Sequence, residues 1–118
     1  MKQCWEGFIA FLGTNDLDET HRFYHEVLGL PLYKDQGWCR IYNVPGGGRL
    51  GFCTHLTVLQ GEKAPLLTLL TPEVDNAWNN LKEAGMEPET PREKPEFKIY
   101  HFFVKDPSGY CVEIQKFL

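Results

Sequence analysis

The segment DPSGYCVEI, residues 106–114, decides how the last part of the chain folds. Asp106, Pro107 and Gly109 are typical of a tight turn, and the residues that follow alternate in polarity as in a β-strand. This strand places one carboxylate, Glu113, among apolar neighbours. Because a lone buried carboxylate is costly, Glu113 is expected to have a partner, which could be a metal ion, a histidine, a ligand or water.

The first half of the chain predicts a strand, a helix and three further strands. Residues 7–13 (GFIAFLG) predict the first strand, and residues 14–30 a helix in which Asp16 and Glu19 have capping-box spacing and Gly29 is the stop. Strands are predicted at about 30–34, 38–44 and 49–55, with a turn at 46–48 between the last two. The apolar face of the helix is predicted to carry Leu17, Tyr24, Val27 and Leu28.

The second half repeats this order. Residues 65–70 predict a strand, and a helix is expected to begin at Thr71 as N-cap with Pro72 in its first turn and to stop at Gly85. Its apolar stripe is Val74, Trp78 and Leu81. A charged loop with room for one short strand precedes strands at 98–104 and 110–117. The pattern predicts an internal duplication in one α+β domain, residues 1–118, with βαβββ modules at about 7–56 and 65–117.

Composition excludes several classes of function. The 118 residues carry a formal charge of −4, from 12 Lys and Arg against 16 Asp and Glu, and no basic run, so no nucleic-acid partner is predicted. The longest apolar run, near residues 66–70, is too short to span a bilayer, so no membrane partner is predicted either. The first residues lack the pattern of a secretory signal, and the four cysteines form no C-x-x-C pair. We therefore predict a cytoplasmic protein with reduced thiols.

Two of these segments together resemble a known family. The helix segment DLDETHRFYHEVLGL, residues 16–30, and the turn-strand DPSGYCVEI are similar to the vicinal oxygen chelate superfamily. This superfamily groups glyoxalase I, fosfomycin-resistance enzymes, extradiol dioxygenases and bleomycin-resistance proteins. The resemblance runs over roughly residues 7–117. It implies two modules forming a curved mixed sheet around a cup, with helices outside, and a homodimer.

The resemblance also implies where a divalent ion would bind in metal-using members. The corresponding positions are Ile9, Leu66, a residue near Gly51, and Glu113. Of these side chains only the Glu113 carboxylate can coordinate a cation, and one carboxylate does not hold a divalent ion tightly. We therefore expect no metal cofactor at these positions.

Strand alternation and the resemblance together predict which residues line the cup. Glu113 shares its face with Cys111 and Gln115, and Ile9 and Phe11 face inward, while Phe8, Ala10 and Leu12 pack on the helix. The predicted ligand-binding residues are Ile9, Phe11, Cys39, Ile41, Cys53, His55, Leu66, Phe103 and Cys111. A mostly apolar wall with a few polar groups is typical of a small-molecule pocket, although the same residues could form a closed core.

His101 and Glu113 are the predicted catalytic pair. The resemblance places His101 on the inward face, where it could act with Glu113 as acid and base, or could simply neutralise it. Other arrangements stay open. Cys53 and His55 share a strand face and could form a nucleophile and base. A relocated metal site could draw on Cys39, Cys53, Cys111, His55 and His101. His21 and His25 have metal-capable spacing on a helix expected to face solvent.

Two classes of function follow. The first is a metal-free binder of a small apolar or aromatic molecule, as in the bleomycin-resistance proteins. The second is an enzyme, either a metal-dependent lyase, isomerase or dioxygenase-like protein with relocated ligands, or a metal-free acid–base catalyst using His101 and Glu113. The sequence leaves open whether any reaction is catalysed.

Overall fold

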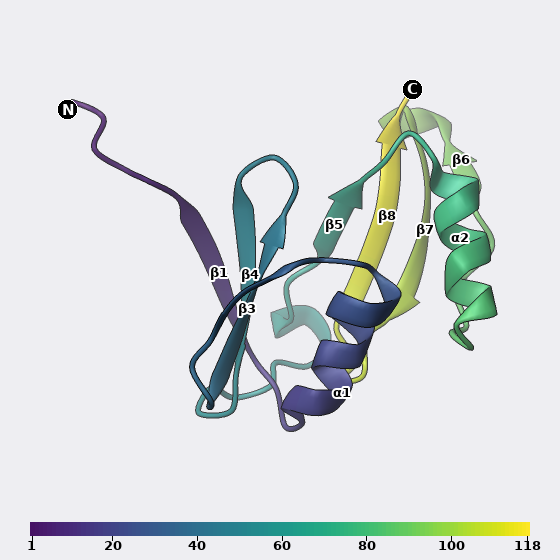
Figure 1. Cartoon of the computed structure of the whole chain (residues 1–118). Helices are drawn as coiled ribbons and strands as arrows, with labels where there is room; N and C mark the ends of the chain where they lie inside the picture. Colours follow the sequence, from purple (N-terminus) through teal and green to yellow (C-terminus); the bar gives the residue numbers. More distant parts are fainter. The chain divides into compact units, whose positions relative to one another are not determined.

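The structure, a computed structural model, describes all 118 residues, and the chain divides into two compact units, Met1–Val58 and Leu59–Leu118. Each unit contains one four-stranded mixed sheet (Figure 1). Each has the element order strand, helix, three strands, which confirms the predicted α+β class and the repetition of βαβββ. No helix in either unit is long and apolar enough to cross a membrane.

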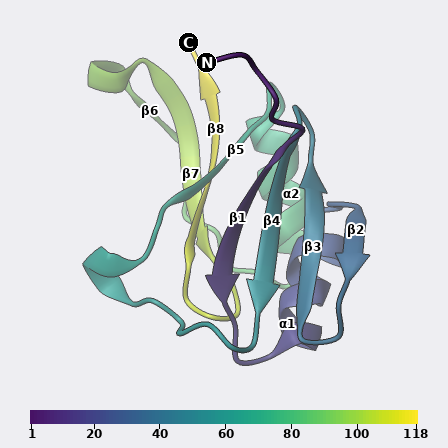
Figure 2. The ribbon, with the colours of Figure 1, turned by 90° about the vertical axis from the view of Figure 1, so that its left-hand side faces the viewer.

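The first unit contains the sheet order β1-β4-β3-β2, which Figure 2 shows with the four strands next to one another. The first strand, β1, pairs parallel with β4, and the other pairs are antiparallel. The elements are β1 (Phe8–Gly13), α1 (Leu17–His21), the π-helix η1 (Arg22–Val27), β2 (Leu32–Asp35), β3 (Cys39–Val44) and β4 (Gly48–Cys53).

The helix of the first unit starts at the predicted residue. Asp16 is the N-cap, and its Oδ1 accepts hydrogen bonds from the backbone N–H groups of Asp18 and Glu19, both at 3.0 Å. The predicted reciprocal bond from Glu19 is absent, because the backbone N–H of Asp16 donates to the Thr14 hydroxyl at 3.1 Å. Gly29 follows the helix with φ of 75°, as predicted for a stop.

The π-helical turn changes which residues this helix buries. A π turn holds more residues than an α turn, and here the backbone N–H of Leu28 bonds to the carbonyl of Phe23, five residues back, at 2.9 Å. Phe23 and Tyr24 are consequently both buried, although only Tyr24 was predicted. Tyr24 stacks on Phe52 of β4, with ring centres 4.4 Å apart. The helix thus covers one face of the sheet.

One predicted helix contact on β1 is wrong. Leu12 is buried, but Phe8 is 66% exposed. Its cross-strand neighbour is Gly48, which has no side chain to cover the ring.

The second unit contains the sheet order β5-β8-β7-β6, again with its first and last strands paired parallel. The remaining pairs are antiparallel. Its elements are the 3-10 turn η2 (Gly61–Lys63), β5 (Leu67–Leu70), α2 (Val74–Glu83), β6 (Arg92–Lys94), the 3-10 turn η3 (Pro95–Phe97), β7 (Ile99–Lys105) and β8 (Cys111–Phe117).

The helix α2 begins later than predicted. Its N-cap is Glu73 and its first residue Val74, while the Thr71 hydroxyl accepts the backbone N–H of Glu73 at 3.1 Å, one turn ahead of the helix. Val74 and Leu81 are buried as predicted. Trp78 is only half-buried, because its indole N–H donates to the Glu89 carbonyl at 3.0 Å near the surface.

The turn that opens the last strand forms as predicted. The Asp106 Oδ1 accepts the backbone N–H groups of Ser108 at 2.8 Å and Tyr110 at 2.9 Å. Gly109 has φ of 93°, a conformation that favours glycine. This turn joins β7 to β8 and brings their residues into register, including His101 and Glu113.

Candidate functional site

The predicted pair of His101 and Glu113 is in contact in the second unit. Phe103 lies opposite Glu113 and His101 opposite Gln115 in the antiparallel pair β7–β8, so His101 and Glu113 are diagonal neighbours on one sheet face. The His101 Nδ1 and the Glu113 Oε2 are 2.5 Å apart, and the two residues are only 5% and 6% exposed. The pair is a short, buried hydrogen bond between an imidazole and a carboxylate.

The other oxygen of Glu113 also has a donor. Thr68 of β5 lies directly beside Glu113 in the parallel pair β5–β8, and its hydroxyl donates to Oε1 at 2.7 Å. The Gln115 amide is assigned with its nitrogen toward Glu113, which gives bonds of 3.0 Å to Oε2 and 3.1 Å to Oε1. Both carboxylate oxygens are therefore satisfied by side chains of the same sheet.

The second ring nitrogen of His101 has no such partner. Nε2 is buried and makes no hydrogen bond. The ring is fixed by Glu113 on one side and meets Phe103 edge to face, with centres 4.9 Å apart. A buried polar atom without a partner is uncommon and marks a place where a ligand group could bind. Whether Nε2 acts as donor or acceptor depends on the proton at Nδ1.

The predicted ligand-binding residues of the second unit lie at or near this pair. Phe103 and Cys111 flank Glu113 on the same strands and are both half-buried. Burial raises the pKa of the Cys111 thiol, with weaker contributions from nearby charges. Leu66 lies just before β5 and is 54% exposed.

In the first unit, four predicted residues form one apolar cluster. Cys39 and Ile41 of β3 and Cys53 of β4 are buried together, and Ile9 of β1 packs against them. Burial first, and then the hydrogen bond with Cys53, raises the pKa of Cys39 to about 12. A thiol with such a pKa is protonated at neutral pH and is a poor nucleophile or metal ligand.

Phe11 and His55 lie apart from this cluster. Phe11 is 50% exposed, and its ring lies over Gly51. His55 is exposed and meets Trp38 edge to face, with ring centres 4.9 Å apart. The side chain that bonds with Cys53 is Cys39, not His55, so the possible nucleophile and base are not joined by a hydrogen bond.

His21 and His25 are half-buried, not on a fully solvated face as expected. Their rings stack 4.7 Å apart. The Nδ1 of His21 bonds to the Tyr42 hydroxyl and that of His25 to the Leu30 carbonyl, both at 2.8 Å. Neither unit brings together three or more His, Cys, Asp or Glu side chains that could hold a metal ion.

The model of the glyoxalase/bleomycin resistance protein/dioxygenase superfamily matches residues 8–114. The chain belongs to this superfamily. A comparison with curated proteins finds no match.

Several solved structures have the same fold as this chain. A glyoxalase/bleomycin resistance protein from Streptomyces sp. CB03234 is 21% identical, with a TM-score of 0.78 over 93% of this chain and 99% of that one. A lactoylglutathione lyase from Agrobacterium tumefaciens is 20% identical, with a TM-score of 0.73 over 92% and 90%. An integron cassette protein from the metagenome of the Halifax Harbour sewage outfall is 17% identical, with a TM-score of 0.79 over 92% and 96%.

The residues at the ligand positions implied for metal-using members do not fit a metal ion. Ile9 is part of an apolar cluster, and Gly51 lies beneath the Phe11 ring. Leu66 has no donor atom, and both oxygens of Glu113 already accept hydrogen bonds from Thr68 and His101. These four positions therefore do not form a metal site.

The sequence did not predict Thr68 as the partner of Glu113. The contact depends on the parallel register that sets Thr68 opposite Glu113. The available signal was a single polar residue, Thr68, among the leucines of residues 66–70.

Proposed function

We propose that this protein binds a small apolar or aromatic molecule without a metal ion, with His101 as the polar anchor. The observation that carries the proposal is the His101 Nε2, which is buried without a hydrogen-bond partner. Leaving such an atom unsatisfied costs about 1–3 kcal/mol, so a ligand hydroxyl, carbonyl or N–H that bonds to it recovers this energy. Phe103 beside it supplies an aromatic surface for the rest of the ligand.

In this proposal Glu113 orients His101 and does not contact a cation. Thr68, Gln115 and His101 already hold both oxygens of the carboxylate. The hydrogen bond between the carboxylate and Nδ1 fixes the orientation of the imidazole ring. Nε2 is then the ring nitrogen that is left to contact a ligand. The ligand contact is thus assigned to the imidazole.

A second candidate function is metal-free acid–base catalysis by the same pair. It is favoured by the 2.5 Å contact between His101 Nδ1 and Glu113 Oε2, which would stabilise the imidazolium formed when Nε2 accepts a proton. The substrate would then carry a proton that a histidine can remove, such as one on carbon next to a carbonyl. Release of a changed product in solution would favour this second candidate.

The binding test follows His101 directly. The protein is labelled with ¹⁵N-histidine and its imidazole signals are recorded while a library of small aromatic and aliphatic compounds is added. A hit is expected to shift the Nε2 signal of His101 saturably and to raise the melting temperature. His101→Gln should abolish the response, while His25→Gln, at a histidine of the first unit that bonds to the Leu30 carbonyl, should leave it unchanged. Hits that bind His101→Gln as tightly as the parent would overturn the anchor role.

The metal-free part of the proposal has its own test. The protein is purified without chelators, soaked in Zn²⁺, Ni²⁺, Mn²⁺ or Fe²⁺, and its metal content per chain is measured. We expect a content far below stoichiometric. A stoichiometric ion that is lost in Glu113→Gln would sink the proposal and favour a lyase, isomerase or dioxygenase with relocated ligands.

We also propose a cytoplasmic homodimer. All four cysteines are free thiols, including the buried neighbours Cys39 and Cys53, which suits a reducing compartment. Large apolar side chains that are exposed in the single chain, such as Trp5 and Phe117, suit burial in an interface. Light scattering after size-exclusion chromatography tests the dimer, and a monomer at all concentrations would contradict it.

A further inference from the structure

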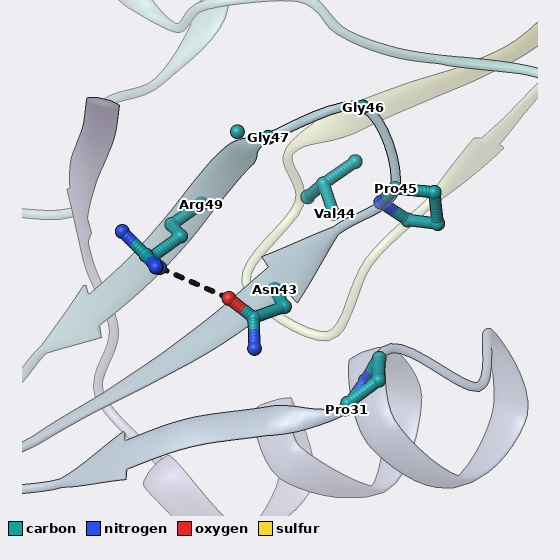
Figure 3. A pocket seen from close by; sticks show the side chains of 8 residues that line it. Pro31, Asn43, Val44, Pro45, Gly46, Gly47 and Arg49 are labelled. Carbon is teal, nitrogen blue, oxygen red and sulfur yellow. Dashed lines mark hydrogen bonds between the residues drawn. The ribbon is translucent and has the colours of Figure 1, made fainter. Parts of the chain in front are cut away.

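Arg49 of the first unit is held in place by three neighbours. Its Nε donates to the Asn43 Oδ1 at 2.9 Å across the β3–β4 pair, as Figure 3 shows. Its guanidinium carbon lies 3.9 Å from the centre of the Tyr33 ring on β2, a stacked cation–π contact. Its Nη1 also lies close to Gly7, where a Cβ would be only 2.9 Å away. The guanidinium therefore has a defined orientation.

This oriented charge has no anionic partner in the protein. Arg40 on the neighbouring strand forms ion pairs with Asp18 at 3.1 Å and Asp35 at 3.4 Å. Arg49 forms none, and its single hydrogen bond uses Nε, which leaves the N–H groups of Nη1 and Nη2 without protein acceptors. The chain has 16 acidic and 12 basic residues, so acidic side chains outnumber basic ones. Arg49 nevertheless has an ordered guanidinium and no acidic partner.

A hollow of about 340 Å³ has Arg49 and its partner Asn43 among its lining residues. It is lined by Pro31, Asn43, Arg49 and the turn residues Val44–Gly48. The turn is uncrowded, since a Cβ on Gly46, Gly47 or Gly48 would meet nothing within 4 Å. The hollow is at the lower end of the size range of small-molecule pockets, and its prolines and Val44 provide apolar walls.

We propose that Arg49 and this hollow form a binding site for the oxyanion of a small molecule, a carboxylate or a phosphate. The two outer nitrogens of a guanidinium form a planar fork that matches two oxygens of either group. Asn43 and Tyr33 orient the fork in advance, so little conformational entropy is lost on binding. The site shares no residue with the His101–Glu113 pair, and the inference goes beyond the function proposed for that pair.

The test uses the Nε–H signals of the two arginines. Because Nε of Arg49 is hydrogen-bonded, its proton exchanges slowly enough to be observed in a ¹H–¹⁵N spectrum. Inorganic phosphate and benzoate are titrated separately at constant ionic strength. We expect the Arg49 signal to shift saturably with at least one of them, while that of ion-paired Arg40 stays in place. Saturation by benzoate alone supports a carboxylate with an apolar body, and saturation by phosphate alone supports a phosphate.

Variants distinguish a specific binding site at Arg49 from non-specific attraction of anions to positive charge. Arg49→Lys keeps the charge but loses the fork, and it should bind the responding anion about tenfold more weakly. Asn43→Ala should weaken binding by a smaller factor, and Arg40→Gln, the matched control, should leave it unchanged. Melting temperatures confirm that each variant is folded. No saturable shift at Arg49, equal shifts at Arg40 and Arg49, or undiminished binding by Arg49→Lys would overturn the proposal.

Discussion

The ring of Phe11 occupies the space in which a side chain at Gly51 would stand. A Cβ built on Gly51 would lie 2.6 Å from two ring carbons of Phe11 and 3.4 Å from Ile41. The two residues are directly opposite in the parallel pair β1–β4. The glycine at this position is therefore a packing requirement of the first unit, and any side chain there displaces an aromatic ring.

We predict that Gly51→Ala lowers the free energy of unfolding by about 1–2 kcal/mol, because Phe11 must leave its position. Urea unfolding measures the change. Gly48→Ala is the matched control, since a Cβ there meets nothing and its φ is ordinary, and it should change stability by less than about 0.5 kcal/mol. In a Phe11→Ala background the penalty at residue 51 should largely disappear. An equal penalty with and without the ring would show that Phe11 is not the cause.

The Thr68 hydroxyl bonds to a buried carboxylate and is therefore expected to matter more than a hydroxyl that bonds at the surface. Thr68→Val removes the donor at 2.7 Å from the buried Glu113 Oε1, and we predict a loss of about 1–3 kcal/mol in the free energy of unfolding. Thr54→Val removes a bond of 3.3 Å from an exposed hydroxyl to the Trp38 carbonyl and should cost less than about 0.5 kcal/mol. Similar losses of unfolding free energy in the two variants would argue against a buried Glu113 that depends on the Thr68 hydrogen bond.

The cysteines are expected to react at very different rates. Cys4 is exposed, while burial raises the pKa of Cys111 and, more strongly, that of Cys39 to about 12. Since the thiolate is the reactive form, iodoacetamide at pH 8 should modify Cys4 first and Cys39 only through opening of the fold. Peptide mass spectrometry over time measures the order. Cys4→Ser should remove the fast phase, and in denaturant all remaining cysteines should react alike. Fast labelling of Cys39 in the folded protein would contradict its burial.

The sequence predicted the elements and the central contact more accurately than the details around them. The tight turn at Asp106 and the alternation of β8 are local patterns, and the family resemblance added the inward placement of His101; together they predicted the contact of His101 with Glu113. Thr68 was missed as a partner because it depends on a parallel register between strands far apart in the sequence. The contact of Tyr33 with Arg49 was not predicted, because it lies next to an irregularity in β2, between Leu32 and Lys34. Phe23, whose burial was not predicted, lies in a π-helical turn, which has no simple pattern in the sequence.

Protonation of His21 is expected to destabilise the first unit. Burial, and then the nearby His25 and Arg40, lower the pKa of His21 from 6.5, while Glu26 and Asp35 oppose this shift. A histidine with a folded-state pKa below its unfolded value contributes stability above pH 6.5, and this stability is lost as the pH falls through the folded-state pKa.

His21→Gln keeps a polar group near the Tyr42 hydroxyl but cannot titrate. We therefore predict that the free energy of unfolding, measured in urea between about pH 5 and 7.5, falls less steeply with acidification in His21→Gln than in the parent. A steeper fall in His21→Gln would mean that the folded protein prefers the protonated imidazole, and that Glu26 and Asp35 outweigh burial and the two cationic neighbours.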